Sequence, residues 1–81
     1  MNDLKLAKLY VRKSQSAAGR GIEFSLSLLS YKNLLRAKKC YYTGIPISNT
    51  TRTIDRIDRT KGYVKGNCVS CHESINQLKN V

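Results

Sequence analysis

The chain has 81 residues and a formal net charge of +10, from nine lysines and six arginines against three aspartates and two glutamates. The length fits one small domain, and no run of about 18 apolar residues is present, so we expect no membrane-spanning helix. Such an excess of positive charge favours a polyanionic partner, nucleic acid above all. A surface charged only for solubility and a helix lying on a membrane are the alternatives.

The cysteines and the N-terminus indicate a reducing compartment. Cys40, Cys68 and Cys71 are an odd number of thiols, which argues against a disulfide scaffold. The N-terminal residues interleave lysines with apolar residues and form no continuous apolar segment, so we expect no signal peptide. We therefore expect a cytoplasmic protein whose cysteines are core residues, metal ligands or reactive thiols.

The first 39 residues predict two helices and a short strand. Apolar residues at helical spacing predict a basic amphipathic helix over about residues 3–18, which the glycines at positions 19 and 21 would end. Residues 22–26 alternate apolar and polar side chains, as in a short strand. Ser27 is a candidate N-cap for a second helix. The last turn of that helix would hold three cations, Arg36, Lys38 and Lys39.

The remaining residues, 40–81, predict a β-hairpin followed by a helix. Residues 43–46 are typical of a turn, residues 53–58 alternate with strand period, and residues 63–65 would form the return strand. A final helix would run from Cys68 to about Asn80. We therefore expect one α+β domain over residues 1–81. Its basic helical region, residues 1–39, would pack on a hairpin–helix region, residues 40–81.

The second half also carries a joint polar pattern. It runs through Asp55-Arg56-Ile57-Asp58, Gly62-Tyr63, Gly66-Asn67, Asn76 and Lys79, and two upstream segments belong to it, residues 20–24 and 40–44. Over about residues 20–80 this pattern resembles the small phage-type HNH endonucleases of the ββα-metal superfamily. The resemblance implies that the helices pack on a ββα-metal, HNH-like hairpin and helix.

The resemblance also implies a chemistry for the hairpin. Such enzymes hydrolyse phosphodiester bonds with Mg²⁺ or another divalent cation, which stabilises charge on the scissile phosphate. Asp55 would be one metal ligand and Asn76 the second, because a strand carboxylate and a helix amide oxygen suit a hard cation. Asn67 would fix the general base through a hydrogen bond or support its loop.

Arg56 departs from the family pattern. It stands where the general-base histidine is normally found, and a guanidinium is protonated at any working pH. Arg56 would instead bind a phosphate or the negative charge that develops during the reaction. The base would then be water on the metal ion, another side chain, or absent. His72 is the only histidine of the chain, and in a helix it would lie one turn from Asn76.

The resemblance also suggests a second metal site, for a structural zinc ion. Related proteins often carry two Cys-x-x-Cys knuckles around a structural zinc ion. Here Thr43 takes the place of one of those cysteines. The remaining candidates for Zn²⁺ are Cys40, Cys68, Cys71 and His72. Packing of the cysteines in a small core is the alternative interpretation.

The expected partner is nucleic acid, in the form of double-stranded DNA, and if the protein is phage-encoded it would act in the cytoplasm of the host cell. Phosphates would be contacted by basic side chains that position the strand without reading bases. These are Lys5, Lys8, Arg12, Lys13, Arg20, Lys38 and Lys39.

Other functions remain open at this point. Asp55 and Arg56 also suit a cross-strand ion pair, Asn67 suits a turn, and Asn76 suits a solvated helix position. A catalytically inactive HNH-derived module that binds DNA or a protein, such as a small phage inhibitor of a host enzyme, is the main alternative. A purely structural role of the N-terminal helix is the third.

Overall fold

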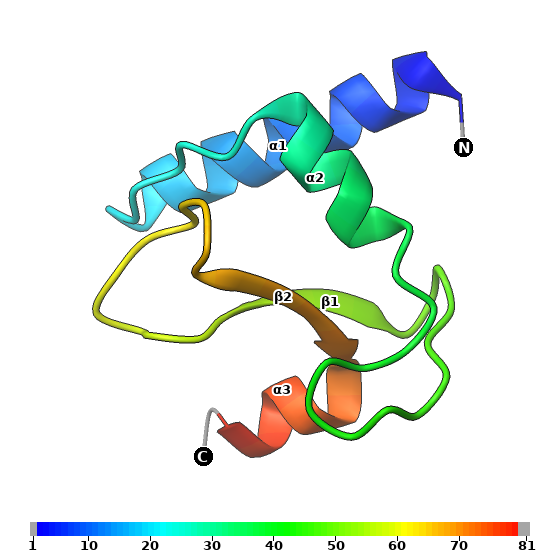
Figure 1. The fold of residues 1–81 in the computed structure, drawn as a ribbon. Coiled ribbons are helices and arrows are strands. Elements are labelled where there is room, and N and C mark those ends of the chain that lie inside the picture. Colours follow the sequence, from blue (N-terminus) through cyan, green and yellow to red (C-terminus); the bar gives the residue numbers. More distant parts are fainter. Residues whose placement is uncertain (1, 80–81) are drawn as a thin grey trace.

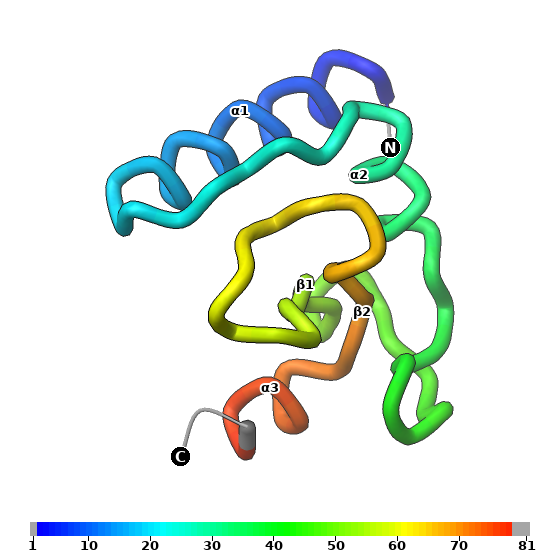
Figure 2. Tube along the Cα trace, turned by 60° about the vertical axis from the view of Figure 1, so that its left-hand side comes forward, coloured from blue at the N-terminus to red at the C-terminus, as the bar shows by residue number. Residues whose placement is uncertain are grey.

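The computed structural model describes residues 2–79. Its elements are, in chain order, α1 (Asp3–Gly19), α2 (Leu28–Leu35), β1 (Arg52–Arg56), β2 (Cys68–His72) and α3 (Glu73–Lys79). Helices α1 and α2 lie on one side of a two-stranded antiparallel sheet and α3 on the other (Figure 1; Figure 2). The architecture is α+β, as the sequence predicts. Within the described residues, no helix is both long and apolar enough to span a membrane.

Helix α1 confirms the first prediction. It begins where the Asn2 side chain accepts the Lys5 N–H at 2.8 Å, and it ends at Gly19. Gly21 then takes a φ of +69°, which turns the chain away from the helix axis. The helix buries Leu6 and Ala17 against the rest of the molecule, while Lys5, Lys8 and Arg12 are exposed and Lys13 is half-buried.

Helix α2 starts as predicted but ends early. The Ser27 side chain accepts the Ser30 N–H at 3.1 Å, which confirms the N-cap. The helix stops at Leu35, so Lys38 and Lys39 do not lie in its last turn, and that prediction is wrong. The reason is an isolated antiparallel bridge between Lys39 and Pro46. The N–H of Ile47 donates to the Lys38 carbonyl at 2.9 Å, and this bond holds residues 38–40 extended.

The predicted strand at residues 22–26 is reduced to a single parallel bridge between Phe24 and Tyr63. The Tyr63 N–H donates to the Glu23 carbonyl at 2.8 Å, and the Ser25 N–H donates to the Tyr63 carbonyl at 3.0 Å. Gly62 permits this crossing, because a Cβ there would lie 2.4 Å from the Glu23 carbonyl oxygen. The segment after α1 is therefore fastened to the hairpin loop by backbone contacts.

The return strand of the hairpin was predicted in the wrong place. Arg52 lies opposite His72 and Arg56 opposite Cys68, so residues 68–72 form the strand and α3 begins only at Glu73. The cause is the buried side chain of Asn67. Its amide donates to the carbonyls of Asp58 (3.1 Å) and Gly62 (2.9 Å), so the loop after β1 closes at Asn67.

Each face of the sheet covers its own apolar cluster. On the side of α1 and α2, Ala17, Leu26 and Tyr63 are buried, and Ile54 and Cys68 pack against them. The second cluster consists of Cys40, Ile47 and Cys71, with Ala37 and Ile75 against it. Side chains three residues apart on a strand point to opposite faces, which places the Cys68 and Cys71 thiols in different clusters.

Candidate functional site

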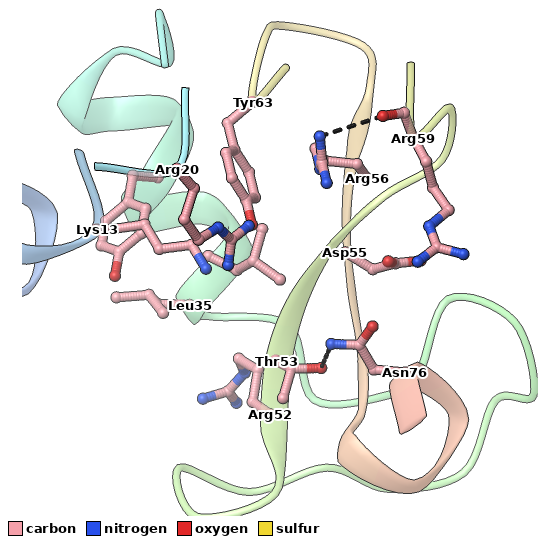
Figure 3. A pocket seen from close by; sticks show the side chains of 12 residues that line it. Lys13, Arg20, Leu35, Arg52, Thr53, Asp55, Arg56, Arg59, Tyr63 and Asn76 are labelled. Atoms are coloured by element: carbon pink, nitrogen blue, oxygen red, sulfur yellow. Dashed lines mark hydrogen bonds between the residues drawn. The ribbon is translucent and has the colours of Figure 1, made fainter. Parts of the chain in front are cut away.

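A cleft of about 520 Å³ contains the residues that the sequence pattern singled out on β1 and α3 (Figure 3). Five cationic side chains and one carboxylate line it: Lys13, Arg20, Arg52, Arg56, Arg59 and Asp55. The remaining lining residues are aromatic, apolar or neutral polar. A concave surface with so unequal a charge attracts anions and concentrates its field on the one carboxylate.

Asp55 lies at the floor of this cleft and is only 9% exposed. Its Oδ2 accepts a hydrogen bond of 2.8 Å from the hydroxyl of Tyr42, which comes from the turn after Cys40. In Figure 3 the side chain of Arg59 extends toward the same carboxylate. A carboxylate buried to this degree requires such partners, because its desolvation alone is unfavourable.

Asn76 approaches from α3. Its Nδ2 donates to the Thr53 hydroxyl at 3.4 Å, and its carbonyl oxygen points toward Asp55 (Figure 3). Thr53 and Asp55 are two residues apart on β1 and therefore share one face of the strand. The Thr53 hydroxyl itself lies 3.3 Å from the Cys71 carbonyl, which it can donate to. The structure thus presents two oxygen donors, from β1 and α3, to one space.

This donor set suits a hard divalent cation with few protein ligands. Among the described residues, no group of three or more His, Cys, Asp or Glu side chains could hold a metal ion. Mg²⁺ characteristically takes one or two oxygen ligands from the protein and completes its shell with water and substrate phosphate. The Asp55 carboxylate and the Asn76 carbonyl oxygen fit that requirement.

Three cations surround Tyr63, which is 5% exposed. Lys13 Nζ lies 4.7 Å and Arg56 Cζ 5.4 Å from the ring centroid, and Arg20 Nη2 lies 3.5 Å from the hydroxyl. Such cation–π contacts hold positive charge against an aromatic face. Arg56 also donates to the carbonyls of Arg59 (3.3 Å) and Lys61 (3.1 Å), so it braces the loop that follows β1.

Arg52 has a structural task. Its Nε donates to the Ala37 carbonyl at 3.0 Å, and Nη2 donates to the same oxygen. Its Nη1 donates to Asn49 Oδ1 at 2.8 Å. These bonds connect the segment after α2 to the start of β1. Arg52 therefore adds to the positive potential of the cleft but has few N–H groups left to bind a ligand.

The predicted site residues Asn67 and His72 lie outside the cleft. Both Nδ2 hydrogens of Asn67 bond loop carbonyls, and its Oδ1 accepts the Asp58 N–H at 2.9 Å, so its contacts are those of a loop-supporting residue. His72 lies on β2, not on a helix, and therefore does not share a helix face with Asn76 as predicted. Its Nδ1 lies 2.8 Å from Ser74 Oγ at the start of α3.

The structure does not bring the four candidate zinc ligands together, because Cys68 lies in the other cluster from Cys40 and Cys71. Burial acts to raise the pKa of the Cys40 thiol, but hydrogen bonds outweigh it and lower this pKa to about 7. They come from the Thr43 side chain and from the backbone of His72, Thr43 and Tyr42. Burial raises the pKa of Cys68.

Of the seven cations predicted to contact phosphate, Lys13 and Arg20 line the cleft. The others lie outside it: Lys5, Lys8, Arg12, Lys38 and Lys39. Sequence reasoning missed Thr53, although its two-residue spacing from Asp55 could have placed it on the same strand face. It assigned no role to Tyr42 and Tyr63, although both lie within segments of the sequence pattern, and it gave no signal for Arg59.

Two curated viral proteins match this chain. It is 35% identical over 71 residues to the uncharacterized protein R423 of Acanthamoeba polyphaga mimivirus, a match that covers 88% of this chain and 13% of the relative. It is 30% identical over 83 residues to an uncharacterized 29.0 kDa protein in the dda-modA intergenic region of Enterobacteria phage T4. That match covers 96% of this chain and 34% of the relative.

The chain therefore spans about one eighth and one third of the lengths of these relatives. No family model and no solved structure matches it.

Proposed function

We propose that this chain is a metal-dependent endonuclease of the HNH type that hydrolyses phosphodiester bonds of double-stranded DNA. The observation that carries the proposal is the cleft: one buried carboxylate shares a space with one amide oxygen, and five cations line the same walls. The order of hairpin and helix in residues 52–79 supports it, since a ββα-metal site takes its ligands from these elements.

In this proposal Asp55 and Asn76 hold the divalent cation, which when bound supplies charge stabilisation at the scissile phosphate and its leaving oxygen. The chain's own residues orient those ligands. Tyr42 fixes the carboxylate through its hydroxyl, and Thr53 turns the amide so that its oxygen faces Asp55. Arg59 at the rim attracts the phosphate oxygens electrostatically.

The site works without a histidine base. The Arg56 guanidinium offers only donors, and His72 lies outside the cleft with its Nδ1 beside Ser74. The protein's contribution is therefore to bind the strand, orient the phosphate and stabilise developing charge. We expect slow hydrolysis, because general-base catalysis typically contributes about 10²–10⁴-fold.

A plasmid-nicking assay across Mg²⁺, Mn²⁺ and chelator tests the proposal. We expect nicking that requires the metal and is lost in Asp55→Asn, which keeps the size of the side chain. Asp58→Asn is the matched control, because Asp58 does not line the cleft and its carboxylate bonds Thr60. Metal-independent nicking, or equal activity of Asp55→Asn and wild type, would contradict the proposal.

A catalytically inactive module that binds DNA or a protein is the second candidate. The contacts of Arg56 favour it, because a guanidinium bonded to two loop carbonyls occupies the position of the base. DNA affinity without nicking in any divalent metal would support this function over the first.

A further inference from the structure

We propose that Lys13, Arg20 and Arg56 form a separate phosphate-binding subsite around Tyr63. This subsite holds a backbone phosphate that neighbours the scissile phosphate at Asp55. The inference rests on the proposed function in taking nucleic acid as the ligand. It requires neither a metal ion nor cleavage.

The three cations come from separate parts of the fold. Lys13 lies within α1, Arg20 is the C-cap of α1, and Arg56 ends β1. In Figure 3 Lys13 and Arg20 approach Tyr63 from the side of α1, and Arg56 approaches it from the side of β1. A chain must fold to gather these charges, so their convergence is a property of the tertiary structure.

The charges of this cluster are not neutralised by an acidic side chain of residues 2–79. Among residues 2–79, the contacts of Lys13, Arg20 and Arg56 are with Tyr63 and with two backbone carbonyls, and none is with a carboxylate. Asp55, the one acidic residue of the cleft, is hydrogen-bonded by Tyr42. Mutual repulsion of the three cations is relieved when an anion binds between them.

Tyr63 defines what kind of anion fits. Its ring is 5% exposed and lies against two cations, so it cannot stack on a nucleobase. Its hydroxyl accepts from Arg20, and its own proton has no acceptor among the described residues. A phosphate oxygen would complete this bond. The contact would therefore be to the backbone and independent of sequence.

The substrate class follows from the position of the subsite. It lines the same cleft as Asp55 and Asn76 but uses different side chains. A strand that fills both must present more than one phosphate, so a polynucleotide binds with both contacts and a mononucleotide with one. A phosphate bound at the subsite would also connect α1 to β1, and should reduce the motion of these two elements relative to each other.

The test measures binding of a short labelled DNA duplex in EDTA, by fluorescence anisotropy over a range of salt. Lys13→Gln and Arg20→Gln should each weaken binding roughly tenfold and lower the log–log salt slope by about 1. Lys8→Gln and Arg12→Gln are matched controls: the sequence grouped both residues with the phosphate contacts, but they lie on α1 outside the cleft, and each variant removes the same charge as Lys13→Gln. They should weaken binding by no more than about twofold.

Equal losses in the cleft and control variants would overturn the subsite, because they would mean diffuse attraction to the whole helix. Circular dichroism checks folding, and if Lys13→Gln is unfolded, the exposed Arg20 decides the result. Arg20→Lys should restore part of the affinity. An Arg20→Gln variant that binds as tightly as wild type, or an Arg20→Lys variant that binds no better than Arg20→Gln, also overturns the subsite.

The failure of the subsite and the failure of the proposed function give different results. Selective loss in the cleft variants without nicking in any metal supports the subsite and overturns the endonuclease. Asp55-dependent nicking with equal losses in all four variants overturns the subsite alone. A wild type that binds no duplex at low salt overturns both.

Discussion

The hydroxyl of Tyr42 donates a hydrogen bond of 2.8 Å to Oδ2 of Asp55, and so joins the turn after Cys40 to the floor of the cleft. The neighbouring ring of Tyr41 packs edge-on against Tyr42, with centroids 5.2 Å apart. Asp55 itself lies on β1, so its orientation depends on a segment that is distant in the chain. A residue that positions a metal ligand in this way contributes without touching the substrate.

Tyr42→Phe should therefore lower divalent-metal affinity and metal-dependent nicking by about tenfold, with little change in stability. The ring remains, and the bond from the hydroxyl to the carboxylate is lost. Calorimetric titration with Mn²⁺ measures the affinity. Tyr41→Phe is the control, because Tyr41 is 63% exposed and its hydroxyl bonds no described residue. Equal effects of the two variants would show that the bond has no orienting role.

Asn76→Asp should increase affinity for a divalent cation, since it replaces a neutral oxygen ligand by a charged one facing Asp55. Asn76→Ala should weaken metal binding less than Asp55→Asn, because an amide contributes less than a carboxylate. Mn²⁺ titration of the three variants establishes the order. Asn33→Asp, an exposed change of the same charge on α2, controls for net charge.

Arg56→His should lower both DNA affinity and stability and should not raise nicking. The substitution removes two donors to loop carbonyls and a cation beside Tyr63, at a cost of about 1 kcal/mol or more in the free energy of unfolding. Urea unfolding and the plasmid assay measure the two effects. If Arg56→His nicks DNA faster than the wild type and is equally stable, the imidazole acts as a base.

Gly62→Ala should reduce the free energy of unfolding by about 2–4 kcal/mol, because its Cβ would clash with the backbone of Glu23. Gly19→Ala is the matched control. No atom lies within 4 Å of the added methyl group there, and alanine favours the helix. Chemical denaturation distinguishes them. A loss in Gly62→Ala no larger than that in Gly19→Ala would show that the crossing at Glu23 can open freely.

The free energy of unfolding should rise with pH between about 7 and 8.5. The folded pKa of Cys40 is about 7, below the ordinary value, so in this window the unfolded thiol keeps a proton that the folded one has lost. The stabilisation is lost as pH falls through 7. Each pH unit adds at most ~1.4 kcal/mol. Urea titrations in reductant at pH values of about 7 and 8.5 measure this increase in the free energy of unfolding. The increase should be absent in Cys40→Ala.

Local signals in the sequence were sufficient for helix α1 and for the start of α2, but not for the end of α2 or for residues 22–26. Helix α1 and the Ser27 cap depend on residues within a few positions of each other, and both were predicted. The return strand was misplaced because glycines at positions 62 and 66 both suit a turn. The choice between them depends on the Asn67 side chain and on the pairing of Tyr63 with Phe24, which are tertiary contacts.

The candidate site divides in the same way. Asp55 and Asn76 could be selected from the joint polar pattern, and the structure places both at one cleft. The bond from Tyr42 and the cations around Tyr63 join segments far apart in the chain. Arg20 and Tyr63, for example, are separated by 43 positions. The sequence selected the cations Lys13, Arg20 and Arg56, but no periodicity or motif records their meeting around Tyr63, which became visible only in the folded chain.

Because the thiols lie in separate clusters, their chemical reactivity can report local opening of the protein. Cys68 belongs to the cluster under α1 and α2, while Cys40 and Cys71 belong to the other. A maleimide reacting with single-cysteine variants would therefore time the exposure of each face of the sheet separately. Cys68 is only half-buried in the folded chain, so its labelling rate is the reference for a thiol that needs little opening. Cys71 is buried, so the ratio of its rate to that of Cys68 measures how often the cluster of Cys40, Ile47 and Cys71 opens.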